Sequence, residues 1–313
     1  MLDVTLLGTG GMMPLVNRYL TSLLVKYNGK SILIDCGEGT QLALSKTCNS
    51  AKDIDVICIT HFHADHISGL PGMLLLMGNQ GKTSLLTIMG PKGTKRIVES
   101  LRVIVPVLPY DINFIEFNES YTNEYNLKDI TRDCKSSEFR IKAFKVNHKI
   151  ECYGYTINLD RLPKFDVDKA NSLGIDKRYW SKLQHGESLE IDGFRYTPDM
   201  VLGDKRKGIK VTYCTDTRPC NNLLENAKNS DLFICEGMYG DKDKFEDAKS
   251  KRHMMMQEAA KLAKDANVNK LWLTHFSPSI VKPWVEYTGV VSSIFSKSLI
   301  ARDGQHKELK FDD

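Results

Sequence analysis

The sequence predicts a layered α/β fold, and three observations lead to this expectation. Strand signals dominate the first 35 residues, strand and helix signals alternate later in the chain, and 42% of the 313 residues are hydrophobic. Such an order of elements is typical of domains in which helices cover sheets. A chain of this length buries a substantial core without disulfide bonds. We therefore interpret residues 1–313 as a single domain.

Three strands are expected at the start of the chain. Residues 2–7 form an apolar run that ends in the glycine-rich stretch 8–11. Two more runs, 22–27 and 31–35, flank Asn28-Gly29-Lys30. Asn-Gly between two such runs is a strong hairpin signal, because the turn needs positive φ angles. A short helix is expected next, over residues 37–44.

Strands and helices alternate after this hairpin. The β-branched run 55–60 predicts a buried strand, and similar signals predict strands over 85–89, 139–146, 210–214, 231–235 and 271–273. Helices are expected over 70–77, 92–101 and 253–265. The pattern loosens between about 160 and 205, where charges of both signs surround Trp180. We interpret this segment as an arm inserted into the domain.

Composition narrows the class of protein. The net charge is only +4, so the charge alone does not indicate a nucleic-acid-binding protein. The basic runs 205–207 and 249–252 are short, as is common on ordinary protein surfaces. The eight cysteines include no C-x-x-C pair, which argues against a thiolate zinc site. The first residues do not resemble a secretory signal, and no apolar run approaches the ~20 residues of a membrane span. We expect a cytoplasmic protein that does not enter a membrane.

The strongest functional signal is a cluster of histidines directly after the predicted strand 55–60. His61, His63, Asp65 and His66 place three imidazoles and one carboxylate within six residues. Imidazole nitrogen and carboxylate oxygen are good zinc ligands, and a turn at a strand end directs such side chains to one point. With only eight histidines in the whole chain, this spacing predicts a metal site.

Three further ligand candidates each follow a predicted strand. They are His148, Asp216 in Thr215-Asp216-Thr217, and His275. Each residue alone also fits a surface or turn position. Together, at the ends of separate strands, they predict a site with room for two metal ions.

Several segments resemble one known family and occur in its order along nearly the whole chain. His-x-His-x-Asp-His is typical of metallo-β-lactamase-fold hydrolases, and the surrounding sequence resembles the ribonuclease Z family of tRNA 3′-processing endonucleases. The matching segments are 7–10, 17–18, 35–41, 66–72, 215–219 and 273–277.

The resemblance implies a four-layer αββα sandwich with two Zn²⁺ ions at its rim, although Mn²⁺ or Fe²⁺ also accept such ligands. It implies that His61, His63 and His148 hold one ion, that Asp65, His66 and His275 hold the other, and that Asp216 bridges both. Asp35 is expected to orient a ligand histidine. The implied substrate is precursor tRNA, from which the enzyme removes the 3′ trailer, and the implied assembly is a homodimer.

The same resemblance gives two residues catalytic roles. Asp65 is suited to accept the proton of the attacking water. His253, expected at the start of the helix 253–265, matches a family histidine that assists at the leaving group. By its own sequence context, His253 beside Lys251 and Arg252 is equally a polar helix start.

Three departures from the family pattern bear on the substrate. Met254-Met255 replaces the usual Ser-Thr after His253, and no arginine follows His275 within the next five residues. The family arm clamps tRNA with a Gly-Pro-containing protrusion, and the stretch 174–180 lacks that pair. Lys177, Arg178 and Lys182 remain candidates for phosphate contacts. Trp180 fits either base stacking or packing within a small amphipathic cap.

Other functions were weighed against this one. A hydrolase with the same core and a small phosphodiester substrate, such as a cyclic nucleotide, is the main alternative. A di-iron redox protein of this fold resembles His-x-Glu-x-Asp, whereas His63 occupies the middle position here. A non-catalytic binding module is expected to lack some ligands, and all seven candidates are present.

Overall fold

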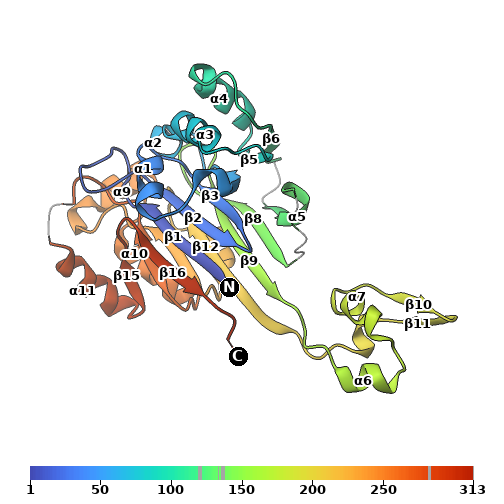
Figure 1. Ribbon diagram of the computed structural model, residues 1–313. Helices are drawn as coiled ribbons and strands as arrows, with labels where there is room; N and C mark the ends of the chain where they lie inside the picture. Colours follow the sequence, from blue (N-terminus) through green and yellow to red (C-terminus); the bar gives the residue numbers. More distant parts are fainter. Residues whose placement is uncertain (119–121, 133, 135–137, 281–282, 313) are drawn as a thin grey trace. The chain divides into compact units, whose positions relative to one another are not determined.

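The computed structural model describes residues 1–118, 122–132, 134, 138–280 and 283–312 (Figure 1). The chain divides into two compact units. The larger unit comprises Met1–Asn158 and Lys210–Lys310, and the smaller comprises Leu159–Ile209 and Phe311–Asp313. Among the described residues, no helix combines the length and apolar character that a membrane crossing requires.

One seven-stranded sheet of the larger unit joins the two ends of the chain. Its strand order is β16-β1-β2-β3-β4-β5-β6. β1, β2, β3 and β16 pair antiparallel, and β3 to β6 run parallel. The strands are β1 (Leu2–Gly8), β2 (Ser22–Tyr27), β3 (Lys30–Ile34), β4 (Ile54–Cys58), β5 (Leu86–Gly90), β6 (Ile112–Glu116) and β16 (Gln305–Leu309).

The predicted hairpin is confirmed. β2 and β3 pair antiparallel with Tyr27 opposite Lys30. Asn28 and Gly29 have φ angles of 46° and 75°, and two positive angles in a two-residue loop match the twist of the flanking strands.

A second seven-stranded sheet carries most of the later strands, in the order β15-β14-β13-β12-β9-β8-β7. β12 to β15 run parallel, and β7 pairs with β8 antiparallel. The strands are β7 (Thr122–Asn126), β8 (Phe139–Lys145), β9 (Tyr153–Arg161), β12 (Arg206–Cys214), β13 (Leu232–Glu236), β14 (Leu271–Thr274) and β15 (Ser298–Ile300).

The two large sheets lie face to face, and helices cover their outer sides (Figure 1). Between the sheets, the Tyr155 hydroxyl donates to the Ile59 carbonyl at 2.6 Å, and Thr21 Oγ1 lies 3.1 Å from the Tyr213 hydroxyl. Apolar clusters join α1, α3 and α4 to the first sheet and α8, α10 and α11 to the second. The predicted four-layer αββα sandwich is therefore confirmed. The helices of this unit are α1 (Thr40–Lys46), α2 (Ala64–Ile67), α3 (Leu70–Asn79), α4 (Thr94–Leu101), α5 (Leu127–Ile130), α8 (Asn221–Ala227), α9 (Phe245–Lys251), α10 (Met256–Asp265) and α11 (Trp284–Ile294).

The smaller unit has its own apolar core around Ala170, Ile175, Leu183 and Val201. Trp180 packs into this unit, because its Nε1 donates to the Ile175 carbonyl at 2.9 Å and its ring centroid lies 5.3 Å from that of Phe165. The elements are α6 (Val167–Ser172), α7 (Trp180–Gln184), β10 (Leu189–Ile191) and β11 (Phe194–Tyr196). An arm over about 160–205 inserted into a single domain stays a prediction.

The expected start of the helix 253–265 is wrong. α10 begins at Met256 rather than at His253. The preceding helix α9 ends at Lys251, and Arg252 follows it in the left-handed conformation with φ 59°. A residue in that conformation ends a helix, so His253 lies in the short link between α9 and α10.

Candidate metal centre

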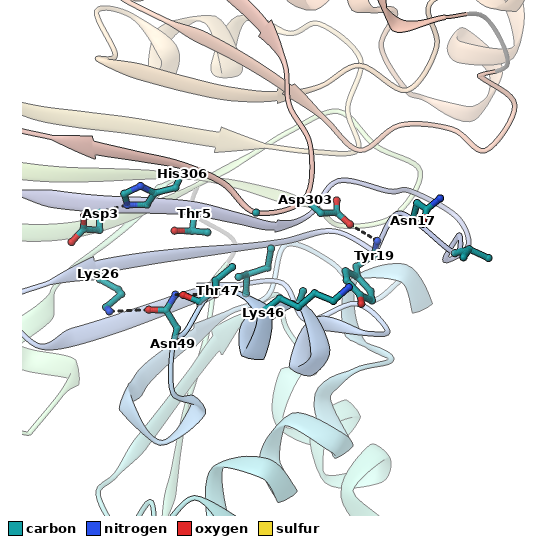
Figure 2. Close-up of a pocket in the computed structure, with 14 residues that line it drawn as sticks. Asp3, Thr5, Asn17, Tyr19, Lys26, Lys46, Thr47, Asn49, Asp303 and His306 are labelled. Carbon is teal, nitrogen blue, oxygen red and sulfur yellow. Dashed lines mark hydrogen bonds and ion pairs between the residues drawn. The ribbon is translucent and has the colours of Figure 1, made fainter.

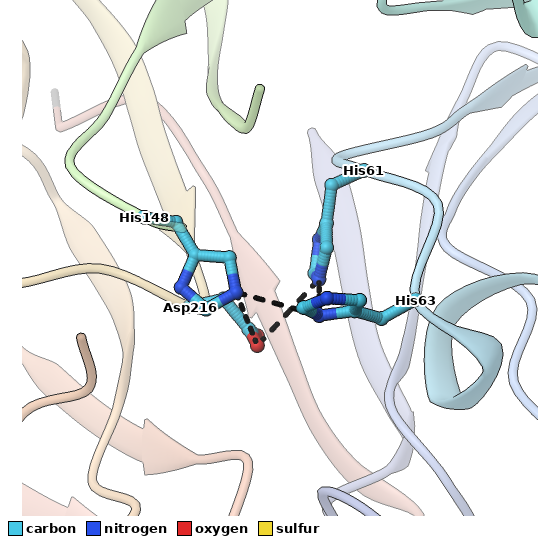
Figure 3. A group of neighbouring side chains, drawn as sticks. All are labelled: His61, His63, His148 and Asp216. Carbon is cyan, nitrogen blue, oxygen red and sulfur yellow. Dashed lines mark hydrogen bonds and ion pairs between the residues drawn. The ribbon is translucent and has the colours of Figure 1, made fainter. Parts of the chain in front are cut away.

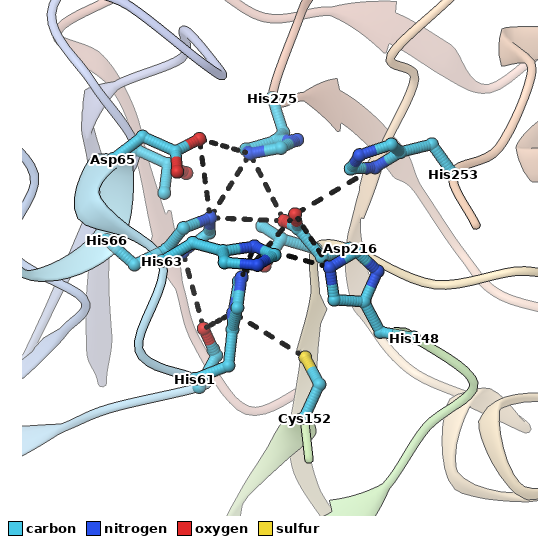
Figure 4. Close-up of polar contacts among 12 residues, drawn as sticks. His61, His63, Asp65, His66, His148, Cys152, Asp216, His253 and His275 are labelled. Carbon is cyan, nitrogen blue, oxygen red and sulfur yellow. Dashed lines mark hydrogen bonds and ion pairs between the residues drawn. The ribbon is translucent and has the colours of Figure 1, made fainter. Parts of the chain in front are cut away.

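The seven predicted ligands lie in segments that follow four strands, with Asp65 and His66 in the short helix α2. His61, His63, Asp65 and His66 follow β4, while His148, Asp216 and His275 follow β8, β12 and β14. β12, β13 and β14 are parallel neighbours, so their carboxyl ends lie at the same sheet edge. All seven side chains converge in one cluster (Figure 4).

One group within the cluster consists of His61, His63, His148 and Asp216 (Figure 3). His63 Nδ1 lies 2.9 Å from His61 Nε2 and 3.4 Å from His148 Nε2. Asp216 Oδ2 lies 3.6 Å from His61 Nε2 and 3.8 Å from His148 Nε2. Three ring nitrogens and one carboxylate oxygen therefore face a common point.

A second group consists of Asp65, His66 and His275. The Nε2 atoms of His66 and His275 lie 3.2 Å apart, and Asp65 Oδ2 lies 3.7 Å and 3.4 Å from them. This group turns to the other oxygen of the shared carboxylate, because Asp216 Oδ1 lies 3.1 Å from both Nε2 atoms.

Asp216 thus offers one oxygen to each group. It is almost fully buried, and its Oδ1 has no hydrogen-bond partner. Burial opposes its ionisation, but the imidazoles of His275, His66 and His61 outweigh burial and hold the pKa of Asp216 well below its usual value. An ionised buried oxygen without a donor is costly unless a cation meets it. The donor set therefore fits divalent metal.

The imidazoles of the first group favour the neutral form. Burial lowers the pKa of His61 well below its usual value and that of His148 to about 4, and it lowers the pKa of His63 as well. A neutral imidazole keeps a lone pair for a metal. In the second group, burial also disfavours the charged form of His66, but Asp216 and Asp35 outweigh burial and raise its pKa. The two carboxylates thus attract positive charge to this ring.

Outer contacts fix the ring orientations. His66 Nδ1 lies 2.8 Å from Asp35 Oδ2, as expected for a carboxylate that orients a ligand histidine. Thr60 donates its backbone N–H to Asp35 at 2.8 Å, and its hydroxyl lies 3.0 Å from His61 Nδ1. His148 Nδ1 lies 3.2 Å from the Arg252 carbonyl, which accepts its proton. Thr60 and Arg252 were missed by sequence reasoning.

His253 lies beside the cluster and contacts a carboxylate that sequence reasoning also missed. Its Nδ1 is 3.0 Å from Glu236 Oε2 and 3.8 Å from Asp216 Oδ2. Glu236 is fully buried at the end of β13, where it also accepts the Thr217 N–H. A charged residue that ends an apolar strand is a usable signal, since Asp35 and Asp216 show the same pattern.

Two residues hold the segment that carries His253. Arg218 donates to the His253 carbonyl at 2.7 Å and to Glu258 Oε2 at 2.8 Å. Glu258 in turn accepts the Met255 N–H at 2.9 Å. Met254 and Met255, which replace the family's Ser-Thr, are both buried in apolar clusters. The altered residues therefore pack, and the placement of His253 relies on Glu236 and Arg218.

The loop between β1 and β2 closes over the second ligand group. The Met12 N–H donates to Asp65 Oδ2 at 2.7 Å. Thr9 and Gly11 hydrogen-bond to the backbone of Phe276, next to His275. A Cβ at Gly11 would lie 2.8 Å from Cε1 of His275, so only glycine allows the loop to approach this ring.

Asp303 anchors both ends of this loop, and Figure 2 shows its contact with Tyr19. Its Oδ1 accepts the Thr9 N–H at 2.9 Å and the Thr9 hydroxyl at 2.7 Å, and its Oδ2 accepts the Tyr19 N–H at 2.6 Å. Asp303 lines a cavity of about 750 Å³ that does not include the ligands. It therefore acts on the metal centre only through the loop.

We expect Asp303→Asn to destabilise the protein and to slow hydrolysis. The Asp303 carboxylate accepts two backbone N–H groups with its two oxygens, whereas asparagine has only one oxygen. One N–H would lose its acceptor, which lowers the free energy of unfolding by about 1–3 kcal/mol. Urea unfolding and the rate on a small phosphodiester measure the two effects. Asp265→Asn, on the exposed face of α10, is the control. Equal unfolding midpoints for both variants would contradict the anchor.

Comparison with known proteins identifies the family. The chain is 54% identical over 313 residues to a protein named Ribonuclease Z from Lachnospira eligens, and the match covers 100% of this chain and 99% of the relative. The chain belongs to the ribonuclease Z family. A family model described as anti-Pycsar protein Apyc1 also matches residues 2–175, which is more than half of the chain. This ribonuclease Z family member therefore belongs to that sequence family as well.

Solved structures show that the ribonuclease Z family member has the metallo-β-lactamase fold. It aligns with the metallo-β-lactamase-fold protein YhfI from Bacillus subtilis at a TM-score of 0.67 and 20% identity, covering 98% of each chain. The short form of human tRNase Z aligns at a TM-score of 0.68 and 23% identity, covering 99% of this chain and 100% of the other. The family and its fold make the protein a metal-dependent hydrolase, which agrees with the cluster described above.

Proposed function

We propose that this ribonuclease Z family member removes the 3′ trailer from precursor tRNA by hydrolysing a phosphodiester bond at a centre of two Zn²⁺ ions. The observation that carries this proposal is Asp216, whose two oxygens face two separate groups of ring nitrogens. A carboxylate shared in this way is suited to bridge two ions. Full-length similarity to a protein named Ribonuclease Z supports the choice of substrate.

The seven ligands divide as the two groups suggest. His61, His63 and His148 would hold one ion, Asp65, His66 and His275 the other, and Asp216 both. Nitrogen and oxygen donors suit zinc, while manganese and iron accept the same set. When bound, such a pair of ions lowers the pKa of a water molecule and neutralises charge that develops on the phosphoryl oxygens.

Asp65 is proposed to accept the proton of the attacking water. Burial disfavours its charge, but its hydrogen bond with His275 and the charge of His66 outweigh burial and lower the pKa of Asp65. The carboxylate is therefore ionised at neutral pH. The Met12 N–H fixes Asp65 Oδ2 from the loop side, so the acceptor is oriented before the substrate arrives.

His253 is proposed to give a proton to the leaving oxygen. Burial alone would discharge the ring, but Glu236 outweighs burial and raises the pKa of His253 to about 9. The imidazolium thus carries its proton at neutral pH. Glu236 holds this proton donor in place through the contact at Nδ1, which leaves Nε2 for the substrate.

The pH dependence of hydrolysis tests this role. Because the pKa of His253 is raised, the positive charge is present below about 9 and is lost as the pH rises through that value. Bound cations repel the imidazolium, so we expect the alkaline limb of kcat at or below about 9. Glu236→Gln removes the stabilising charge and should move this limb to lower pH, whereas Glu246→Gln on the exposed face of α9 should not. An unmoved limb in Glu236→Gln would rule out this proton donor.

Three further expectations from the sequence complete the proposal. We propose that the arm over about 160–205 contacts tRNA, through Lys177, Arg178 and Lys182. Trp180 is half-buried and packs against Phe165 within the smaller unit. We further propose a homodimer in the cytoplasm.

A cleavage assay decides between the proposed function and a small-substrate phosphodiesterase. Purified protein is incubated with precursor tRNA and, separately, with bis-p-nitrophenyl phosphate, and bound metals are measured by elemental analysis. We expect cleavage at the 3′ trailer and about two zinc ions per chain. Hydrolysis of the small ester alone would defeat the tRNA proposal, and less than one metal per chain would defeat the metal centre.

A further inference from the structure

A cavity of about 960 Å³ adjoins the first ligand group on the side of His148. It lies wholly within the larger unit. Its walls come from the connection between β8 and β9, from the end of β6, from the stretch before α4 and from Arg252. His148 belongs both to this wall and to the ligand group, so the cavity and the candidate metal centre share a side chain.

The cavity carries uncompensated positive charge. Lys92, Lys145, Lys149 and Arg252 line it, and the first three are exposed. Within the described part of the chain, no ion pair or side-chain hydrogen bond involves the ammonium groups of these three lysines. The positive charges of these exposed side chains are therefore not neutralised by a carboxylate of the described residues, and they are available to a molecule that enters the cavity.

The two carboxylates in the same wall are already engaged. Glu116 Oε1 accepts the Lys95 N–H at 2.9 Å near the start of α4, and Glu151 Oε1 accepts the Tyr153 hydroxyl at 2.8 Å. Neither forms an ion pair with a cation of the cavity among the described residues. Four cations against two occupied carboxylates make this an environment for an anion.

Arg252 ties the cavity to the ligand group. Its guanidinium donates to the His148 carbonyl at 2.8 Å and to Asn147 Oδ1 at 3.3 Å, while its own carbonyl accepts from His148 Nδ1. Its left-handed conformation, with φ 59° and ψ 49°, is uncommon for a residue with a side chain. The cation is thereby fixed next to His148.

We propose that this cavity binds the ribose–phosphate backbone of the RNA strand beside the cleaved bond, with Lys92 and Lys145 each meeting a phosphate. The inference rests on the proposed function and assigns a place to the strand next to the scissile phosphate. Once that phosphate is at the metal centre, the backbone that continues past His148 enters a cavity whose cations match its charges. Phosphate contacts of this kind position a strand without reading its sequence.

The double variant Lys92→Gln/Lys145→Gln tests the proposal. With precursor tRNA we expect kcat/KM to fall about tenfold or more at moderate salt, chiefly through KM. The slope of log(kcat/KM) against log[salt] should flatten by roughly 0.7 for each lost contact to a single strand. Bis-p-nitrophenyl phosphate has one phosphate and does not reach along the cavity, so its hydrolysis should stay within about twofold.

The matched control is Lys264→Gln/Lys307→Gln, which removes the same charge outside the cavity and should leave the salt slope unchanged. If the wild-type protein cuts precursor tRNA and both double variants behave alike, the cavity is not the strand site and the proposed function stands. An equal loss on both substrates would also overturn the inference, because the lysines would then support the centre itself. If the wild-type protein leaves precursor tRNA uncut, the proposed function fails first.

Discussion

Asp216→Asn is expected to release metal from the centre and to lower hydrolysis of every substrate by well over a hundredfold. Loss of a residue that merely orients a ligand costs about 10–100-fold, and Asp216 faces both ligand groups directly. Asparagine keeps the shape but removes the charge, and it points an amide toward imidazole nitrogens. Both groups lose their common oxygen donor at once.

Elemental analysis of the purified Asp216→Asn variant, together with the rate on bis-p-nitrophenyl phosphate, measures this effect. Asp243→Asn, at an exposed position before α9, should keep metal and rate. Circular dichroism shows whether the fold survives, because the loss of a buried charge among imidazoles also affects stability. A variant that kept two ions per chain and full activity would show that Asp216 is not the shared ligand.

Asp65→Ala is expected to lower the rate about 10²–10⁴-fold, the range for loss of a positioned proton acceptor, while it removes at most one ion. Asp65 contacts only the second ligand group, so His61, His63 and His148 keep their donors. Asp65→Ala should therefore lose much of its rate but little of its metal, whereas Asp216→Asn should lose both.

The measurement for Asp65→Ala is single-turnover cleavage with metal content determined on the same sample. Asp53→Ala, which changes an exposed carboxylate before β4, serves as the control. Loss of both ions in Asp65→Ala would assign it a structural role in the whole centre instead of the proton-accepting role.

Much of the fold was predictable because its signals are local. Asn28-Gly29 specifies a hairpin through the φ angles of two residues, and the run 55–60 shows its strand through β-branched side chains. The convergence of the seven candidate ligands was also predictable, since each follows a strand and strand ends of a layered fold converge on one rim. The start of α10 was not, because the left-handed Arg252 interrupts a periodic pattern that sequence alone reads as continuous.

The unpredicted part of the site depends on partners that are distant in sequence. The role of Glu236 in the site depends on its contact with His253, seventeen positions later. Asp303 binds Thr9 and Tyr19, which lie near the other end of the chain. Asp303 lies in a polar stretch, where an acid has many possible partners and its spacing does not select one. Such contacts become visible only when the sheets have brought the ends of the chain together.

The pairing of β16 with β1 has a consequence for shortened forms of the protein. All seven candidate ligands lie at or before residue 275, whereas β16 and Asp303, which pair with β1 and hold its loop, follow them in the sequence. In a protein shortened before Asp303, the loop would keep its contacts with Phe276 but lose those of Thr9 and Tyr19 with Asp303. Such a protein should therefore contain every candidate ligand and still hydrolyse its substrate slowly, because the Met12 N–H is held less firmly over Asp65.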